Sequence, residues 1–237
     1  MDIMSYRSTI PFALNLDYRP RPSFQSYGTW NGFLAKANNK FLMSTRGPEL
    51  MLLEISPIDS RLATEEDPDV FLTLLQRFEV RDAQAGLLVL QRKGQFHPRA
   101  GRALGSQMVR FGEWIDLPST TARDLLWIQA DIKPTLLGWL VGISWRFPVL
   151  GLDLQYPDGH LAHFRLIPEL LRNGFIISPT VTNIKEYVAA SNGSSDVAQA
   201  RPTQIRCTGN RFVNLVYNEN TAFGFTAYAI GGTSNFP

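Results

Sequence analysis

The residues best suited to ligand chemistry lie in one short stretch near the N-terminus, YRPRPSFQSYGTW at 18–30. A proline follows each of its two arginines, and the residue before a proline is kept out of the helical region, so an extended, stiff segment is predicted. Guanidinium groups bind anions through paired hydrogen bonds, and aromatic rings offer flat faces for stacking. The predicted ligand-binding residues are Arg19, Arg21, Gln25, Tyr27 and Trp30.

Spacing on this stiff segment predicts that Arg19, Arg21, Tyr27 and Trp30 line one exposed groove that binds an anionic glycan. The alternative is that the prolines brace a connection and the two arginines pair with Asp59 or Glu54. The two interpretations differ in what replacing the arginines would do. The first predicts a loss of binding, and the second predicts a loss of stability.

Carboxylates are the main candidates for catalysis, because two of them flanking a cleft can hydrolyse a glycosidic bond. The candidates are Glu54, Asp59, Glu113, Asp116, Asp131 and Asp153. Sequence alone does not pair them, and surface or turn positions are the alternative. The chain has no nucleophile elbow, phosphate loop or dinucleotide fingerprint. We therefore assign no catalytic residue and no cofactor.

The histidines and the single cysteine suggest no metal site. His160 and His163 are three residues apart, so on a strand they point to opposite faces and cannot chelate one ion together. His163 is predicted to pair with Asp153 across a hairpin, and His97 to be a solvated loop residue. Cys207 lies in an apolar alternation and is predicted to be a core thiol.

Composition narrows the range of protein classes. The chain has 237 residues, of which 44% are hydrophobic, and its formal net charge of +2 gives no nucleic-acid footprint. With one cysteine, no disulfide can form within the chain. The longest apolar run, 136–145, is about half of the roughly 20 residues that a membrane span needs. No basic leader precedes the first strand, so we expect either a cytoplasmic protein or the soluble part of something longer.

The stretch 150–166 predicts a β-hairpin whose register follows from its turn. Pro157-Asp158 suits the centre of a type I turn, and Gly159 suits the left-handed position after it. This three-residue loop with a bulge places Asp153 opposite His163. It also places apolar residues on one shared face, in the pairs Leu150–Leu166, Leu152–Phe164 and Leu154–Ala162. A slip of one residue would reverse the faces.

The first part of the chain is predicted to mix helices and strands. The apolar runs 50–55 and 86–90 are typical of buried strands. A helix is predicted to begin at Asp67-Pro68-Asp69, and another to span 30–37 and end near Asn38-Asn39.

After a polar, basic and turn-rich segment, the period of the apolar residues changes to two, as in strands. We predict an α+β protein with a small mixed α/β domain at 1–93 and a linker at 94–107. An antiparallel β-sandwich domain, jelly-roll-like in type, is predicted at 108–237.

Several segments, in order, resemble a known group of proteins. They are YRPRPSFQSY (18–27), RGPE (46–49), PIDSRL (57–62), FRLIP (164–168) and GFIISP (174–179). Their series resembles the soluble C-terminal region of large, poorly characterised bacterial multi-pass membrane proteins, some of which look like lipid-linked glycosyltransferases. The resemblance covers most of residues 2–190. It implies an extracytoplasmic location, in the periplasm or at the cell surface, beside a membrane portion. It carries over no catalytic residues.

These observations favour a non-catalytic, extracytoplasmic accessory domain of a membrane-associated glycan-handling protein, binding a glycan or a protein partner. Such a domain is expected to be joined to or docked on a membrane protein, and a cytoplasmic location is the alternative. A carbohydrate-active hydrolase with a carboxylate pair is the rival function, and a structural assembly module is the third. A cleft with two carboxylates and an aromatic platform would favour the hydrolase. A flat apolar patch would favour assembly.

Overall fold

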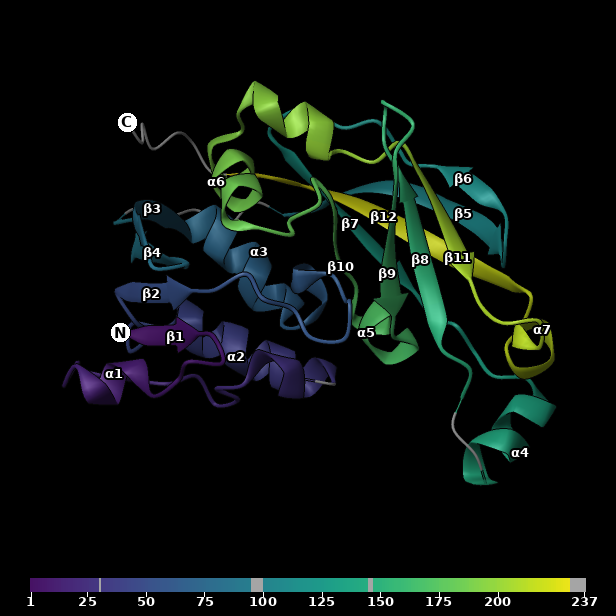
Figure 1. Cartoon of the computed structure of the whole chain (residues 1–237), viewed down its shortest axis with the longest axis horizontal. Coiled ribbons are helices and arrows are strands. Elements are labelled where there is room, and N and C mark those ends of the chain that lie inside the picture. Colours follow the sequence, from purple (N-terminus) through teal and green to yellow (C-terminus); the bar gives the residue numbers. More distant parts are fainter. Residues whose placement is uncertain (30, 95–99, 145–146, 231–237) are drawn as a thin grey trace.

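A computed structural model describes residues 1–29, 31–94, 100–144 and 147–230 of the chain (Figure 1). Within these residues the protein has mixed α and β content, with three four-stranded sheets. The sheet orders are β1-β2-β4-β3, β10-β7-β12-β5 and β6-β11-β8-β9. Apart from the parallel pair β1 and β2, neighbouring strands in these sheets run antiparallel.

The first sheet belongs to the N-terminal part of the chain. Its strands are β1 (Asp2–Met4), β2 (Leu50–Leu53), β3 (Phe78–Gln84) and β4 (Leu87–Arg92). The helices of this part are α1 (Ile10–Ala13), α2 (Gly32–Met43) and α3 (Pro68–Arg77), with 3-10 turns η1 (Ser26–Gly28) and η2 (Ala63–Glu65). The predicted strands at 50–55 and 86–90 are confirmed as β2 and β4, and α3 begins where the Asp-Pro-Asp motif predicted.

The other two sheets are built by the second part of the chain. One contains β5 (Arg102–Arg110), β7 (Asp124–Ala130), β10 (Phe175–Ser178) and β12 (Asn220–Ala229). The other contains β6 (Trp114–Asp116), β8 (Leu150–Gln155), β9 (Leu161–Leu166) and β11 (Gln204–Thr208). One apolar cluster includes residues from both sheets, among them Ile128 and Phe223 from the first and Leu152 and Cys207 from the second. Cys207 is therefore a core thiol, as predicted.

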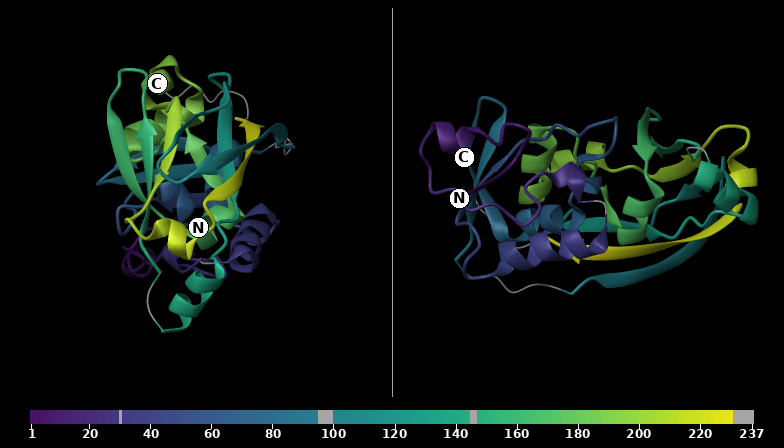
Figure 2. Two further views of the ribbon diagram at one scale, coloured as in Figure 1. Left: turned by 90° about the vertical axis from the view of Figure 1, so that its right-hand side faces the viewer. Right: turned by 90° about the horizontal axis from the view of Figure 1, so that it is seen from below.

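Shorter helices connect these strands. They are α4 (Leu136–Ser144), α5 (Pro168–Asn173), α6 (Ile184–Asn192), α7 (Val213–Val216) and the 3-10 turn η3 (Ser195–Ala200). Figure 2 shows that α4 extends beyond the sheets at one end of the molecule. Within the described ranges, none of the helices combines the length and the apolar character that crossing a membrane requires.

The predicted linker at 94–107 is wrong for residues 102–107, which belong to β5 and pair with β12. The part at 95–99 lies outside the described residues. β5 is an edge strand, and most of its residues are exposed, so its polar composition resembled that of a loop.

A second apolar cluster joins the two parts of the chain. β7 is buried on both faces: Ile128 belongs to the cluster between the second and third sheets, and Trp127 belongs to the same cluster as Phe71 of α3. A hydrogen bond also joins the two parts of the chain: the Thr64 hydroxyl donates to the carbonyl oxygen of Ile176 at 2.7 Å. The N-terminal part thus shares its core with β7, β10 and α6.

The hairpin formed by β8 and β9 has the predicted register. Asp153 faces His163, and Leu152 faces Phe164. Gly159 has a φ of +85°, and its N–H donates to the carbonyl oxygen of Tyr156 at 2.9 Å. The carboxylate and the imidazole are neighbours, with 2.6 Å between Asp153 Oδ1 and His163 Nδ1.

Gly159→Val is expected to lower the free energy of unfolding by at least about 1 kcal/mol, because a left-handed φ strains an L-residue. Open space surrounds the Cβ position of Gly159, so a loss of stability would come from the strained backbone conformation and not from a steric clash. Gly159→Asn should lose less, since asparagine tolerates this region. Gly94 also has open space but no left-handed φ, which makes Gly94→Val the control. Urea denaturation would measure all three, and equal losses at both glycines would contradict the assigned turn.

Candidate functional site

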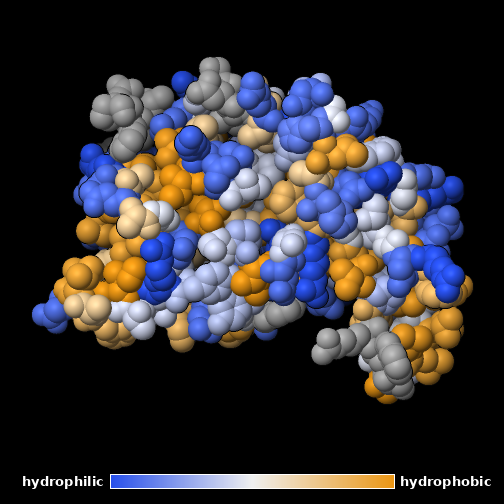
Figure 3. Space-filling model, in the orientation of Figure 1, coloured by the Kyte–Doolittle hydropathy of each residue, from blue (hydrophilic) through white to orange (hydrophobic). Residues whose placement is uncertain are grey.

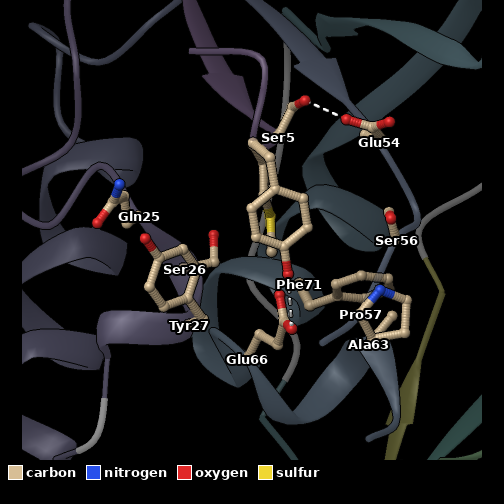
Figure 4. A pocket seen from close by; sticks show the side chains of 12 residues that line it. Ser5, Gln25, Ser26, Tyr27, Glu54, Ser56, Pro57, Ala63, Glu66 and Phe71 are labelled. Carbon is tan, nitrogen blue, oxygen red and sulfur yellow. Dashed lines mark hydrogen bonds between the residues drawn. The ribbon is translucent and has the colours of Figure 1, made fainter. Parts of the chain in front are cut away.

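A pocket opens at the edge of the first sheet, between the end of β1, the turn η1 and the loop after β2 (Figure 4). The cavity itself is small, about 20 Å³, and the space reaches about 400 Å³ only when the open solvent at its mouth is included. The side chains that line it are Met4, Ser5, Tyr6, Gln25, Ser26, Tyr27, Glu54, Ser56, Pro57, Ala63, Glu66 and Phe71. Two of them, Gln25 and Tyr27, belong to the predicted ligand-binding stretch.

Parallel pairing of β1 and β2 creates this pocket. Met4 pairs with Leu53, so the residues that follow the two strands emerge side by side at one edge of the sheet. The Ser5 hydroxyl accordingly donates a hydrogen bond to Glu54 Oε2, as Figure 4 shows. The carboxyl ends of parallel strands are a common place for ligands.

An aromatic pair forms one wall of the pocket. The Tyr6 and Tyr27 rings stack with 5.7 Å between their centroids and 29° between their planes. Tyr6 is 45% exposed, so the pair is open to a ligand. Burial of its hydroxyl, together with the nearby Glu66 carboxylate, raises the pKa of Tyr6 to about 12. The neutral phenol is therefore a hydrogen-bond donor, and it donates to Glu66 Oε1 at 3.5 Å.

Two carboxylates in this pocket have pKa values shifted in opposite directions. Burial raises the pKa of Glu66, although the Ile58 N–H donates to its carboxylate at 2.9 Å. Burial acts on Glu54 in the same direction, but hydrogen bonds from Ser5 and Arg7 outweigh it and lower the pKa of Glu54. Arg7 Nη2 lies 2.8 Å from Glu54 Oε1. Glu66 therefore keeps its proton to a higher pH than Glu54 does.

Arg21 does not line an exposed groove, and that prediction is wrong. Its side chain has no exposed surface, and its Nε and Nη1 lie 2.9 Å and 3.7 Å from carboxylate oxygens of Asp2 and Asp67. The alternative interpretation, in which the arginine is structural, holds for Arg21 with different partners. Its charge is balanced inside the protein and is not presented to a ligand.

The other predicted ligand-binding residues lie in different places. Arg19 is exposed and pairs with Asp17, with 2.8 Å between Nη2 and Oδ2. Trp30 lies outside the described residues. Gln25 and Tyr27 line the pocket, so the structure brings together two of the five predicted ligand-binding residues there.

Sequence reasoning missed Tyr6 and Glu66. The sequence does contain a signal for Tyr6. When two strands pair in parallel, the polar residues that directly follow them meet at the same end of the sheet. Detecting it requires knowing that residues 2–4 pair with residues 51–53, which are far apart in the chain. For Glu66, burial of the whole segment 61–68 was the missing information.

Of the six carboxylates considered for catalysis, Glu54 lines the pocket. The others lie elsewhere and have polar partners: Asp59 with Arg165, Glu113 with Arg110, Asp116 with Gln204, Asp131 with Arg172, and Asp153 with Arg206. These contacts fit surface and turn acids for four of the five, whereas Asp153 is largely buried in β8. They leave Glu54 and Glu66 as the two carboxylates of the site.

Within the described part of the chain, no group of three or more His, Cys, Asp or Glu side chains is arranged to hold a metal ion. His160 instead lies 2.6 Å from Asp158 and stacks on Tyr156, with 4.1 Å between ring centroids. Burial raises the pKa of Cys207 to about 12, so its thiol stays protonated in the core.

No protein-family model, no curated protein and no solved structure matches the sequence or the fold.

Proposed function

We propose that the pocket beside the stacked Tyr6 and Tyr27 binds a neutral sugar unit of a glycan, and that the protein is a non-catalytic accessory domain of a glycan-handling system. The observation that carries this proposal is the stacked tyrosine pair, with Tyr6 exposed and Tyr27 half-buried, next to polar side chains. Apolar sugar faces can stack on aromatic rings. The carboxylates, the amide of Gln25 and the hydroxyls of Ser26 and Ser56 offer hydrogen-bond partners for sugar hydroxyls.

The charges of the pocket favour a neutral glycan over the anionic one expected from the sequence. Glu54 and Glu66 both face the pocket. Arg7 is already paired with Glu54, and Arg21 is buried between two acids. Arg61, whose charge acts on Glu66 and Tyr6, has almost no exposed surface. An anionic sugar would meet two carboxylates in a lining whose described residues include no arginine or lysine.

The test is a titration of the protein with neutral oligosaccharides of different monosaccharides, followed by calorimetry. Tyr27→Ala should weaken the affinity for the bound sugar at least about tenfold, because a stacking contact is lost. Tyr18→Ala is the matched control, since Tyr18 packs on Phe12 and lies outside the pocket. Equal affinities in both variants, or preferential binding of acidic sugars, would contradict the proposal.

A second candidate function is glycoside hydrolysis, favoured by the opposite pKa shifts of Glu66 and Glu54 in one pocket. In that reaction Glu66 would protonate the leaving oxygen, and the ionised Glu54 would act as base or nucleophile. Product analysis on the same oligosaccharides tests it. Turnover that disappears in Glu66→Gln, but persists in the exposed control Glu49→Gln, would establish a hydrolase. Binding of the oligosaccharides without turnover would support the non-catalytic accessory domain instead.

Two further parts of the proposal concern architecture and location. The shared apolar cluster of the two C-terminal sheets supports a β-sandwich, for which we propose a jelly-roll-like type. The resemblance to extracytoplasmic regions of multi-pass membrane proteins supports an extracytoplasmic, membrane-associated location. Fractionation of cells that produce the protein with an epitope tag would test this location, and recovery from the cytosol would contradict it.

A further inference from the structure

An apolar surface covers the end of the molecule that α4 and α7 form, at the lower right of Figures 1 and 3. We call it the apolar tip and define it by Leu136, Trp139, Leu140, Ile143, Phe212 and Leu215. All six side chains are about half exposed or more, and Leu136 reaches 87%. The tip lies at the opposite end of the molecule from β1 (Figure 1), whose residue Met4 lines the pocket.

Helix α4 turns an apolar face to solvent, whereas an ordinary surface helix turns a polar face outward. Leu136, Trp139, Leu140 and Ile143 have the spacing of one helix face, and that face is exposed. Gly138 lies on the opposite face, against the backbone of Val216, where a Cβ would come within 1.9 Å of the carbonyl oxygen. Helix α4 therefore packs on α7 through a glycine, and the face that it turns outward is apolar.

The tip is held in a defined position. The Thr135 hydroxyl donates to the carbonyl oxygen of Leu215 at 2.6 Å, and the Thr135 N–H donates to that of Val216 at 2.9 Å. The same hydroxyl accepts from the Gly138 N–H at 3.0 Å, at the start of α4. These hydrogen bonds fix α4 to α7, so the exposed apolar face has a defined position on the protein.

Two cations lie beside the tip. Lys133 precedes α4, with 3.7 Å between its Nζ and Asp131 Oδ2, and Arg211 directly precedes Phe212. The Arg211 guanidinium lies 4.7 Å from the centre of the Phe212 ring. Aromatic and leucine side chains beside cations are the composition of surfaces that lie in a membrane interface.

We propose that the apolar tip inserts into the interfacial layer of a lipid bilayer with anionic headgroups, while Lys133 and Arg211 meet the phosphates. Basic residues near such a surface are attracted to it, and the apolar side chains leave water. A second copy of the chain fits less well. A helix of nine residues is only about 13 Å long, and a stable dimer buries roughly 800 Å² on each partner.

Co-sedimentation of the whole chain with vesicles tests this proposal. On vesicles of phosphatidylcholine and phosphatidylserine, in a ratio of about 3:1, we expect binding that weakens on phosphatidylcholine alone. The triple variant Leu136→Ser, Trp139→Ser, Ile143→Ser should bind at least about tenfold more weakly. Leu161→Ser is the control, because Leu161 is 57% exposed on β9, away from the tip.

Charge and oligomeric state complete the test. Lys133→Glu with Arg211→Glu should reduce binding to the anionic vesicles and leave any weak binding to neutral ones unchanged. Circular dichroism would verify that each variant is folded, and the substituted side chains are exposed. Failure of the wild type to bind either vesicle, or equal binding by the triple variant, would overturn the proposal. A dimer that the triple variant dissociates without lipid would also overturn it, in favour of a protein interface.

Discussion

Arg21→Met is expected to lower the free energy of unfolding by about 3–5 kcal/mol, because removing one partner of a buried ion pair leaves its counter-charges uncompensated. The side chains of Arg21, Asp2 and Asp67 all have no exposed surface. Methionine is unbranched and replaces most of the apolar stem of arginine, so the change tests mainly the charge and the hydrogen bonds of the guanidinium.

Arg21 joins three segments of the N-terminal part. Besides its two acids, it donates through Nη2 to the carbonyl oxygen of Ile3 in β1 at 3.2 Å. Asp67 precedes α3, and it accepts a hydrogen bond from Asn38 of α2 at 2.7 Å. Loss of the guanidinium therefore removes a connection between β1, the extended segment and the start of α3.

Arg19→Met is the matched control, two residues away in the same Arg-Pro pattern. Arg19 and Asp17 are exposed, with side-chain exposures of 60% and 72%, and an exposed pair contributes less than about 1 kcal/mol. Urea denaturation followed by circular dichroism would measure both variants. Similar losses in the two variants would contradict a structural role specific to Arg21. Loss of sugar binding in Arg21→Met, without loss of stability, would restore the predicted ligand contact.

Local features of the sequence predicted the hairpin of β8 and β9 correctly. Its turn needs residues with special backbone preferences, Pro157, Asp158 and Gly159, and its faces follow an alternation with a period of two. Both signals lie within 17 residues, between 150 and 166, so no distant part of the chain decides the register. The start of α3 at Asp67-Pro68 was predictable for the same reason.

Features that depend on distant segments were not predictable. Arg19 and Arg21 have the same local pattern, and only packing against β1 and α3 buries the second one. Asn38 was expected near the end of a helix, but α2 continues to Met43, and the buried Asn38 amide bonds to Ser23 and Asp67. The pocket beside Tyr6 and Tyr27 depends on the parallel pairing of β1 with β2.

Carboxyl groups buried in the N-terminal part predict an unusual dependence of stability on pH. Burial raises the pKa of Asp67 to about 7, although Arg21 and Asn38 oppose the shift. Burial also raises the pKa values of Asp2, Glu65 and Glu66. Between the usual carboxyl value near 4 and about pH 7, the folded protein therefore binds more protons than the unfolded chain does. Stability is greatest below this window and falls as pH rises through it.

The melting temperature is accordingly expected to be several degrees higher at about pH 5 than at about pH 8. Asp67→Asn should reduce this difference, because an amide resembles the protonated carboxyl group and does not titrate. Asp17→Asn, which removes an exposed carboxylate, should keep the wild-type difference. Thermal unfolding of the three proteins at both pH values would measure the effect. A wild-type melting temperature that rises from pH 5 to pH 8, with the same rise in Asp67→Asn, would show that Asp67 is buried as a carboxylate, held ionised by Arg21.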